Sequence, residues 1–161
     1  MEEKTNVMRI LDRMKIPYKS YSFPPELAVN AVAVAGIIGK PPESVFKTLV
    51  TEGKSKPQRY FVFMIPSGAE LDLKKAAASV GEKSVEMIKM KDLLPVTGYI
   101  HGGCSPIGMK KEFVTVIDSS VSGFETIAFS AGKVGYQVEM TPENLFRAVR
   151  LASADITANI G

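Results

Sequence analysis

VFKTLVTEGKSKPQRYFVFMI, residues 45–65, is the stretch on which the fold of this 161-residue chain depends most. Two runs rich in β-branched and aromatic residues, 45–51 and 59–65, flank a polar segment that contains Gly53 and Pro57. Such runs favour strands, and glycine and proline between two strands favour a reversal of the chain. The stretch therefore predicts an antiparallel hairpin.

Helices and further short strands are predicted on both sides of this hairpin. The helices are expected after the N-cap Thr5 and before Pro17, over residues 27–38 and 71–80, and after the N-cap Thr141. Strands are expected at 18–23, 99–101, 115–118, 125–130 and 136–140. Pro95 is expected to stop a short turn over 91–94, and the tail from Ser153 gives no signal.

These elements do not alternate regularly between strand and helix, so the α/β class is disfavoured. We expect an α+β fold in which a mixed sheet curls into a barrel flanked by helices. The chain length fits a single domain over residues 1–161.

Composition excludes several classes of protein. The longest apolar stretch, residues 27–38, is too short to span a membrane, and residues 1–4 do not begin a secretory signal, so a cytoplasmic protein is expected. One cysteine and one histidine argue against a disulfide or a metal site, and no cofactor is expected. The formal charge of +3 fits either contact with a phosphate backbone or an ordinary solvated surface. The methionines and phenylalanines are interpreted as core.

Lys47 interrupts an otherwise apolar strand and is the first candidate functional residue. Strand alternation places it on the same face as Val45 and Leu49. An ammonium at the wall of a pocket can bind a phosphate or a developing oxyanion. A lysine at the edge of a sheet, with its charge in water, is the alternative.

The segment GGCSPIG, residues 102–108, is the second candidate. Its glycines allow close approach to a ligand, its backbone N–H groups are potential donors, and Ser105 adds a hydroxyl. An ordinary connecting turn is the alternative. His101 and Cys104 lie three residues apart and suggest a thiol hydrolase, although a half-buried structural cysteine is the simpler interpretation.

Six motifs occur together in this chain. They are VFKTL at 45–49, ELDLKK at 70–75, VEM at 85–87, TGY at 97–99, GGCSPIGMKK at 102–111 and SAGK at 130–133. In this combination and order the chain closely resembles the YbaK/EbsC family over nearly its whole length. The resemblance implies a free-standing relative of the editing domain of bacterial prolyl-tRNA synthetases, with a mixed-sheet barrel that hydrolyses mischarged tRNA.

The resemblance also implies which residues form the site. Lys47 matches the functional lysine of the family, and Gly103 and Pro106 match the wall that holds the aminoacyl ester and its terminal adenosine. The expected catalytic residues are Lys47, Gly103, Ser105 and Pro106. The expected substrate-binding residues are Tyr21, Asn30, Thr48, Gly102, Cys104, Gly108 and Gln137.

Two departures from the family pattern put cysteine specificity in question. Asn30 and its neighbours replace an aromatic-glycine pair, and Gln137 stands where the namesake branch carries an acid. A loss of an aromatic group and a carboxylate from a pocket can change which amino acid is accepted.

The sequence therefore predicts a trans-editing hydrolase for Cys-tRNA(Pro) or another small aminoacyl-tRNA. The attacking group would be water or the thiol of the substrate itself. The expected partner is the acceptor end of a mischarged tRNA, with prolyl-tRNA synthetase as a further candidate partner, and the protein would be a monomer or a homodimer. A non-catalytic module that binds an aminoacyl or nucleotide-like ligand is the alternative.

Overall fold

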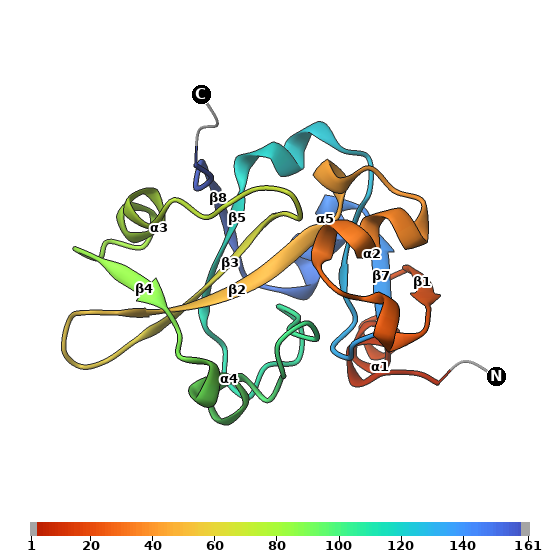
Figure 1. The fold of residues 1–161 in the computed structure, drawn as a ribbon, viewed down its shortest axis with the longest axis horizontal. Helices are drawn as coiled ribbons and strands as arrows, with labels where there is room; N and C mark the ends of the chain where they lie inside the picture. The colour runs from red at the N-terminus through yellow and green to blue at the C-terminus, as the bar shows by residue number, and fades with distance from the viewer. Residues whose placement is uncertain (1–2, 159–161) are drawn as a thin grey trace.

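The computed structural model describes residues 3–158 and contains two sheets (Figure 1). The larger sheet has the strand order β4-β2-β3-β5-β8. Its strands are β2 (Phe46–Gly53), β3 (Tyr60–Pro66), β4 (Val85–Met87), β5 (Val114–Asp118) and β8 (Ala152–Ala154). Strands β2 and β3 pair antiparallel, which confirms the predicted hairpin, whereas β3 with β5 and β5 with β8 pair in parallel. The larger sheet is therefore mixed.

The smaller sheet is antiparallel, with the order β1-β7-β6. It consists of β1 (Lys19–Ser22), β6 (Ile127–Ser130) and β7 (Tyr136–Met140). An isolated parallel bridge between Val45 and Ala128 joins it to the larger sheet. Side chains from both sheets, among them Val62 and Phe129, belong to one buried apolar cluster. The α+β class with a mixed sheet is thus confirmed, and the strands described in residues 3–158 pair into two sheets that share this cluster. A second buried cluster, which includes Phe61 and Phe63, lies on the other face of the larger sheet.

Local end signals position most of the helices. These are α1 (Asn6–Arg13), α2 (Ala31–Ile38), α3 (Leu73–Ser79), α4 (Met90–Thr97) and α5 (Pro142–Ala148), with short 3-10 turns at Pro25–Leu27, Pro42–Ser44 and Ser119–Gly123. The side chains of Thr5 and Thr141 accept backbone N–H groups at the starts of α1 and α5, as predicted. Asp72 does the same for α3, which therefore starts at Leu73, two residues later than predicted. Gly39 ends α2 in the left-handed conformation, with φ 73°.

The helix predicted over 27–38 begins later than expected. Asn30 accepts a hydrogen bond from the backbone N–H of Ala33 at 2.8 Å and so caps α2, which starts at Ala31. The residues before Asn30 form a separate 3-10 turn instead of a first helical turn. Asparagine is more favourable at an N-cap, where its side chain accepts a backbone N–H, than inside a helix. This preference places the start of α2 after Asn30.

Two other predictions about elements were wrong, and one strand was not predicted. Pro95 does not stop the turn before it but lies inside α4, which ends at Gly98 with φ 88°. Residues 99–101 do not form a strand, because the N–H of Tyr99 bonds to the hydroxyl of Thr97 and its own hydroxyl donates to the carbonyl of Ile107. The tail contains β8, which the sequence did not indicate because its short side chains carry no strand signal.

Candidate active site

A cleft of about 800 Å³ follows one side of β2. Figure 1 shows β2 crossing the molecule, with α2 near one end of it and β4 and α4 toward the other end. The lining comes from residues before and within α2, from β2, from residues 67–70, from the segment between β4 and α4, and from Gly102, Cys104 and Gln137. A volume of this size is typical of sites for ligands larger than one amino acid.

Lys47 lies in the wall of this cleft and is half-buried. It forms no hydrogen bond or ion pair with any residue in 3–158. Burial lowers the pKa of its ammonium group, while the nearby carboxylate of Glu70, which also lines the cleft, acts in the opposite direction. A partly desolvated cation without a fixed partner can bind an anionic group of a ligand.

Two further polar atoms in the cleft also lack partners. The hydroxyl of Thr48 and the side-chain oxygen of Gln137 are buried and form no hydrogen bond with the described residues. Buried polar atoms are nearly always bonded, because leaving one unsatisfied costs about 1–3 kcal/mol. Both residues line the cleft, so a ligand bound there is the candidate for the missing partner.

The glycine-rich segment 102–108 presents its beginning to the cleft. Gly102 and Cys104 line the cleft, and the backbone N–H groups of these two residues donate to no described residue. The N–H of Gly103, by contrast, bonds to the carbonyl of Ile100 at 3.0 Å. Gly103 packs so closely on the chain that an added Cβ would lie 3.2 Å from the backbone nitrogen of Val134. Two free donors thus remain for a ligand.

The end of the same segment faces elsewhere. Ser105 is fully buried, and its hydroxyl accepts the N–H of Ile107. Pro106 and Gly108 line a separate cavity of about 330 Å³ together with Ile10 of α1. The structure therefore brings Lys47, Thr48, Asn30, Gly102, Cys104 and Gln137 together at the cleft, and it does not bring Ser105, Pro106 or Gly108 to it.

Tyr21 is another predicted site residue that does not line the cleft. Its hydroxyl donates to the carboxylate of Glu139 at 2.5 Å, and the same carboxylate accepts from Thr126 at 2.5 Å and pairs with the ammonium of Lys40 at 2.6 Å. We call these four residues the Glu139 cluster. Burial raises the pKa of the Glu139 carboxyl, but the hydrogen bonds from the other three members outweigh it and lower the pKa to about 2. The cluster is fully paired and ties Lys40, just beyond α2, to β7.

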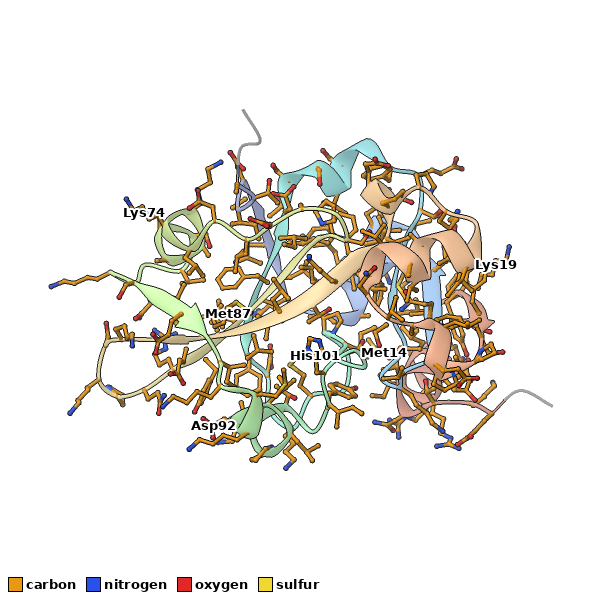
Figure 2. All side chains as sticks on the ribbon, in the orientation of Figure 1. Met14, Lys19, Lys74, Met87, Asp92 and His101 are labelled. Carbon is orange, nitrogen blue, oxygen red and sulfur yellow. The ribbon has the colours of Figure 1, made fainter. Side chains whose placement is uncertain are left out.

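Cys104 does not fit a nucleophile, although it lines the cleft. Burial raises the pKa of its thiol to about 12, so the reactive thiolate is scarce at neutral pH. His101, labelled in Figure 2, also lines the cleft and is exposed, but no hydrogen bond joins it to Cys104. The geometry gives the thiol no base.

Several lining residues were not predicted from the sequence. Val29 and Val32 near α2, and Met87 and Met90 near α4, line the cleft and are exposed. The two methionines had been interpreted as core, because apolar character alone does not distinguish a core residue from an exposed one in a cleft. In a long helix or strand, an exposed apolar residue can be recognised because it lies off the apolar face. The segments that carry these four residues are too short to show such a face.

Within residues 3–158, no three His, Cys, Asp or Glu side chains are grouped so as to hold a metal ion. None of the helices there has the length and apolar character needed to cross a membrane.

Comparison with known families gives a match over most of the chain. The model of the aminoacyl-tRNA editing domain matches residues 26–148. A relative from Enterococcus faecalis, named "Putative Cys-tRNA(Pro)/Cys-tRNA(Cys) deacylase EbsC", is 46% identical over 158 residues, which cover 97% of this chain and 94% of the relative.

Solved structures share the fold at lower sequence identity. One, described as "Crystal structure of a putative trans-editing enzyme for prolyl tRNA synthetase", has a TM-score of 0.82 and 20% identity, and the match covers 98% of this chain and all of the other. Another, the hypothetical protein APE2540, has a TM-score of 0.83 and 18% identity, with 97% of this chain and all of the other covered. At these identities the likeness concerns the fold alone.

Proposed function

The chain belongs to the aminoacyl-tRNA editing domain family, and we propose that it hydrolyses the ester between a small, wrongly attached amino acid and the 3′ end of a tRNA. The observation that carries this proposal is the unpaired ammonium of Lys47 in a cleft that also contains two free backbone N–H donors, at Gly102 and Cys104. Because the E. faecalis relative is named for Cys-tRNA(Pro) and Cys-tRNA(Cys), cysteinyl esters are the first substrates to test.

Hydrolysis of the aminoacyl ester requires that the negative charge formed in the reaction be stabilised. It does not require a nucleophile from the protein. Attack on the ester carbonyl places a charge on its oxygen, and the N–H groups of Gly102 and Cys104 are free to donate to that oxygen. Collapse of this intermediate breaks the bond to the ribose oxygen, which takes up a proton and leaves as the tRNA hydroxyl. Lys47 would hold the phosphate next to the terminal ribose and so position the ester.

The attacking group in this proposal comes from solvent or substrate. Water attack releases the free amino acid directly. For a cysteinyl ester, the thiol of the substrate can attack its own carbonyl: the carbon–sulfur bond forms, the bond to the ribose oxygen breaks, and the proton of the thiol goes to the departing tRNA hydroxyl. Water then opens the cyclic thioester and releases the amino acid. Cys104 is not needed in either route, which agrees with its raised thiol pKa.

The partner in this proposal is the acceptor end of a mischarged tRNA, in the cytoplasm where such tRNAs are used. A prolyl-tRNA synthetase is a reasonable further partner, because it produces mischarged tRNA(Pro). The unpaired Lys47 and the modest basic excess of the chain support contact with a phosphate backbone.

The test is single-turnover hydrolysis of Cys-tRNA(Pro), Ala-tRNA(Pro) and Ser-tRNA(Pro), with correctly charged Pro-tRNA(Pro) as the control substrate. We expect at least one mischarged ester to be cleaved, and Lys47→Ala to slow that cleavage by about 100-fold. Lys91→Ala is the matched control variant, because Lys91 is exposed and does not line the cleft.

Two results would contradict this proposal. Full activity of Lys47→Ala would overturn the role of the lysine. Tight binding of these tRNAs without turnover would instead support a non-catalytic binding module of the same fold.

A further inference from the structure

A second cavity, of about 330 Å³, is bordered by the end of the glycine-rich segment, by α1 and by the end of α5. It shares no lining residue with the cleft along β2. Its size lies near the lower end of the range of about 300–1,000 Å³ that is typical of sites for small molecules. The mechanism proposed above leaves this cavity unused.

One part of the lining of the second cavity is apolar. Ile10 of α1, Ile107, Phe113 and Val149 at the end of α5 contribute to it. The ring of Phe113 packs edge-on against the ring of Tyr60, with 6.3 Å between the centroids, and this contact holds Phe113 in position. A hydrocarbon group of a ligand could be buried on these side chains, and such burial favours binding.

The other part of the lining carries charge. Lys111 and Arg150 contribute two cations and Glu112 contributes one anion, and all three residues are exposed. None of the three side chains forms a hydrogen bond or an ion pair with a residue in 3–158. The backbone N–H groups of Gly108 and Met109, which also line the cavity, donate to no described residue. The cavity therefore offers several donors to an anionic group, with one carboxylate beside them.

This combination of groups selects among small ligands by charge. A carboxylate suits Lys111 and Arg150, because ammonium and guanidinium groups form strong charge-assisted hydrogen bonds with it. A ligand with a second negative charge would be repelled by Glu112, whereas a ligand that also carries an ammonium group would pair with it. The apolar part of the lining requires a hydrocarbon group as well. A free α-amino acid with an apolar side chain carries all three groups on one carbon.

We infer that the second cavity binds a free α-amino acid with an apolar side chain. Its carboxylate pairs with Lys111 and Arg150, its ammonium group pairs with Glu112, and its side chain contacts Ile10 and Phe113. An aminoacyl-tRNA does not fit this description, because its carboxyl group is esterified and carries no charge. The inference goes beyond the proposed function and does not depend on it, since the cavity and the cleft have separate linings.

The experiment titrates isotope-labelled protein with three probes and follows the backbone amide signals by NMR. L-leucine carries all three groups, isocaproate lacks the ammonium group, and isoamylamine lacks the carboxylate. We expect L-leucine to bind with a dissociation constant on the order of 0.1–1 mM, and each of the other two probes to bind at least about tenfold more weakly. The signals that shift should be those of residues 106–113 and 148–150.

Two variants test the charged contacts separately. Arg150→Gln should bind L-leucine at least about tenfold more weakly than the wild type does. Glu112→Gln should also weaken L-leucine about tenfold, but it should not weaken isocaproate, because that probe has no ammonium group to lose a partner. Arg147→Gln is the matched control, since Arg147 is exposed, bonds to the side chain of Asn144 and does not line the cavity. This variant should bind L-leucine as the wild type does.

Several results would overturn the inference. These are the absence of any saturable shift with L-leucine, equal affinity for the three probes, and tighter binding of inorganic phosphate than of L-leucine. Loss of L-leucine binding in Lys47→Ala but not in Arg150→Gln would place the amino acid in the cleft and would also overturn it. The titrations contain no tRNA, so a failure to hydrolyse any mischarged ester would overturn the proposed function and leave this inference standing.

Discussion

Gln137 and Glu139 are two positions apart on β7, so they share one face of the strand, and each is only 8% exposed. Their polar atoms have opposite surroundings. The carboxylate of Glu139 has three partners, whereas the side-chain oxygen of Gln137 has none among the described residues. A fully paired buried group holds the fold together, and an unpaired one facing a cleft is available to a ligand. Two polar residues on the same strand thus have different roles: Glu139 stabilises the fold, and Gln137 is available for ligand binding.

The largest expected effect on this comparison comes from Glu139→Gln. The substitution removes the charge that pairs with Lys40, and loss of one partner of a buried ion pair costs about 3 kcal/mol. The free energy of unfolding in urea measures this cost. Glu86→Gln is the matched control, because Glu86 pairs with Lys54 on the surface, where solvent screens the pair, and its loss should change the free energy of unfolding far less. Equal changes in the free energy of unfolding for the two substitutions would contradict a structural role of the Glu139 cluster.

Acid titration sharpens the same comparison. The pKa of Glu139 is lowered from 4.5 to about 2, so the folded protein keeps this carboxylate charged at pH values where the unfolded chain is protonated. Its contribution to stability is therefore complete above a pH of about 4.5 and disappears as the pH falls toward about 2. We expect the difference in unfolding free energy between the wild type and Glu139→Gln to shrink over that interval. A difference that is independent of pH would contradict the assignment.

Gln137→Leu should have a smaller effect on stability and a larger one on selectivity. Removal of an unpaired buried oxygen should change the unfolding free energy by less than about 1 kcal/mol. The ratio of kcat/KM between seryl and alanyl esters should fall by about tenfold, because the leucine cannot accept a hydrogen bond from a polar substrate side chain. If the ratio stayed constant while stability fell, Gln137 would resemble Glu139 in its role.

The smallest effect is expected from Cys104→Ala. The thiol is buried with a pKa of about 12, and its removal should leave the rate of hydrolysis within about twofold of the wild type. Alkylation of the folded protein at neutral pH should also be slow compared with alkylation of the unfolded chain. Rapid alkylation together with loss of activity would revive the thiol hydrolase hypothesis.

Much of the fold followed from local signals. The hairpin at residues 45–65 and the N-caps Thr5 and Thr141 were predicted correctly, because strand-forming side chains and capping side chains act within a few residues. The missed strand β8 depends on parallel pairing with β5, which is distant in sequence. No local pattern reports such a pairing.

The site was predictable to a similar extent. Lys47 interrupts an apolar strand, and the glycines of 102–108 are conspicuous, so both could be singled out from the residues alone. The sequence did not predict which end of segment 102–108 faces the cleft. Gly102 lines the cleft and Pro106 lines a separate cavity, and this difference arises only from tertiary packing. Met87 and Met90 were missed for a different reason, because the sequence alone does not distinguish an exposed methionine from a buried one.

Helix α1 packs against the glycine-rich segment. The contact is so close that a Cβ added to Gly108 would lie 3.1 Å from the side chain of Ile10. At the other end of the chain, the N–H of Ile156 bonds to the carboxylate of Asp118, and Ile156 is completely buried. Both ends lie outside the 26–148 that the family model matches. The portion that the family model matches is therefore smaller than the portion that builds the core, because α1 and Ile156 both contribute buried side chains to it.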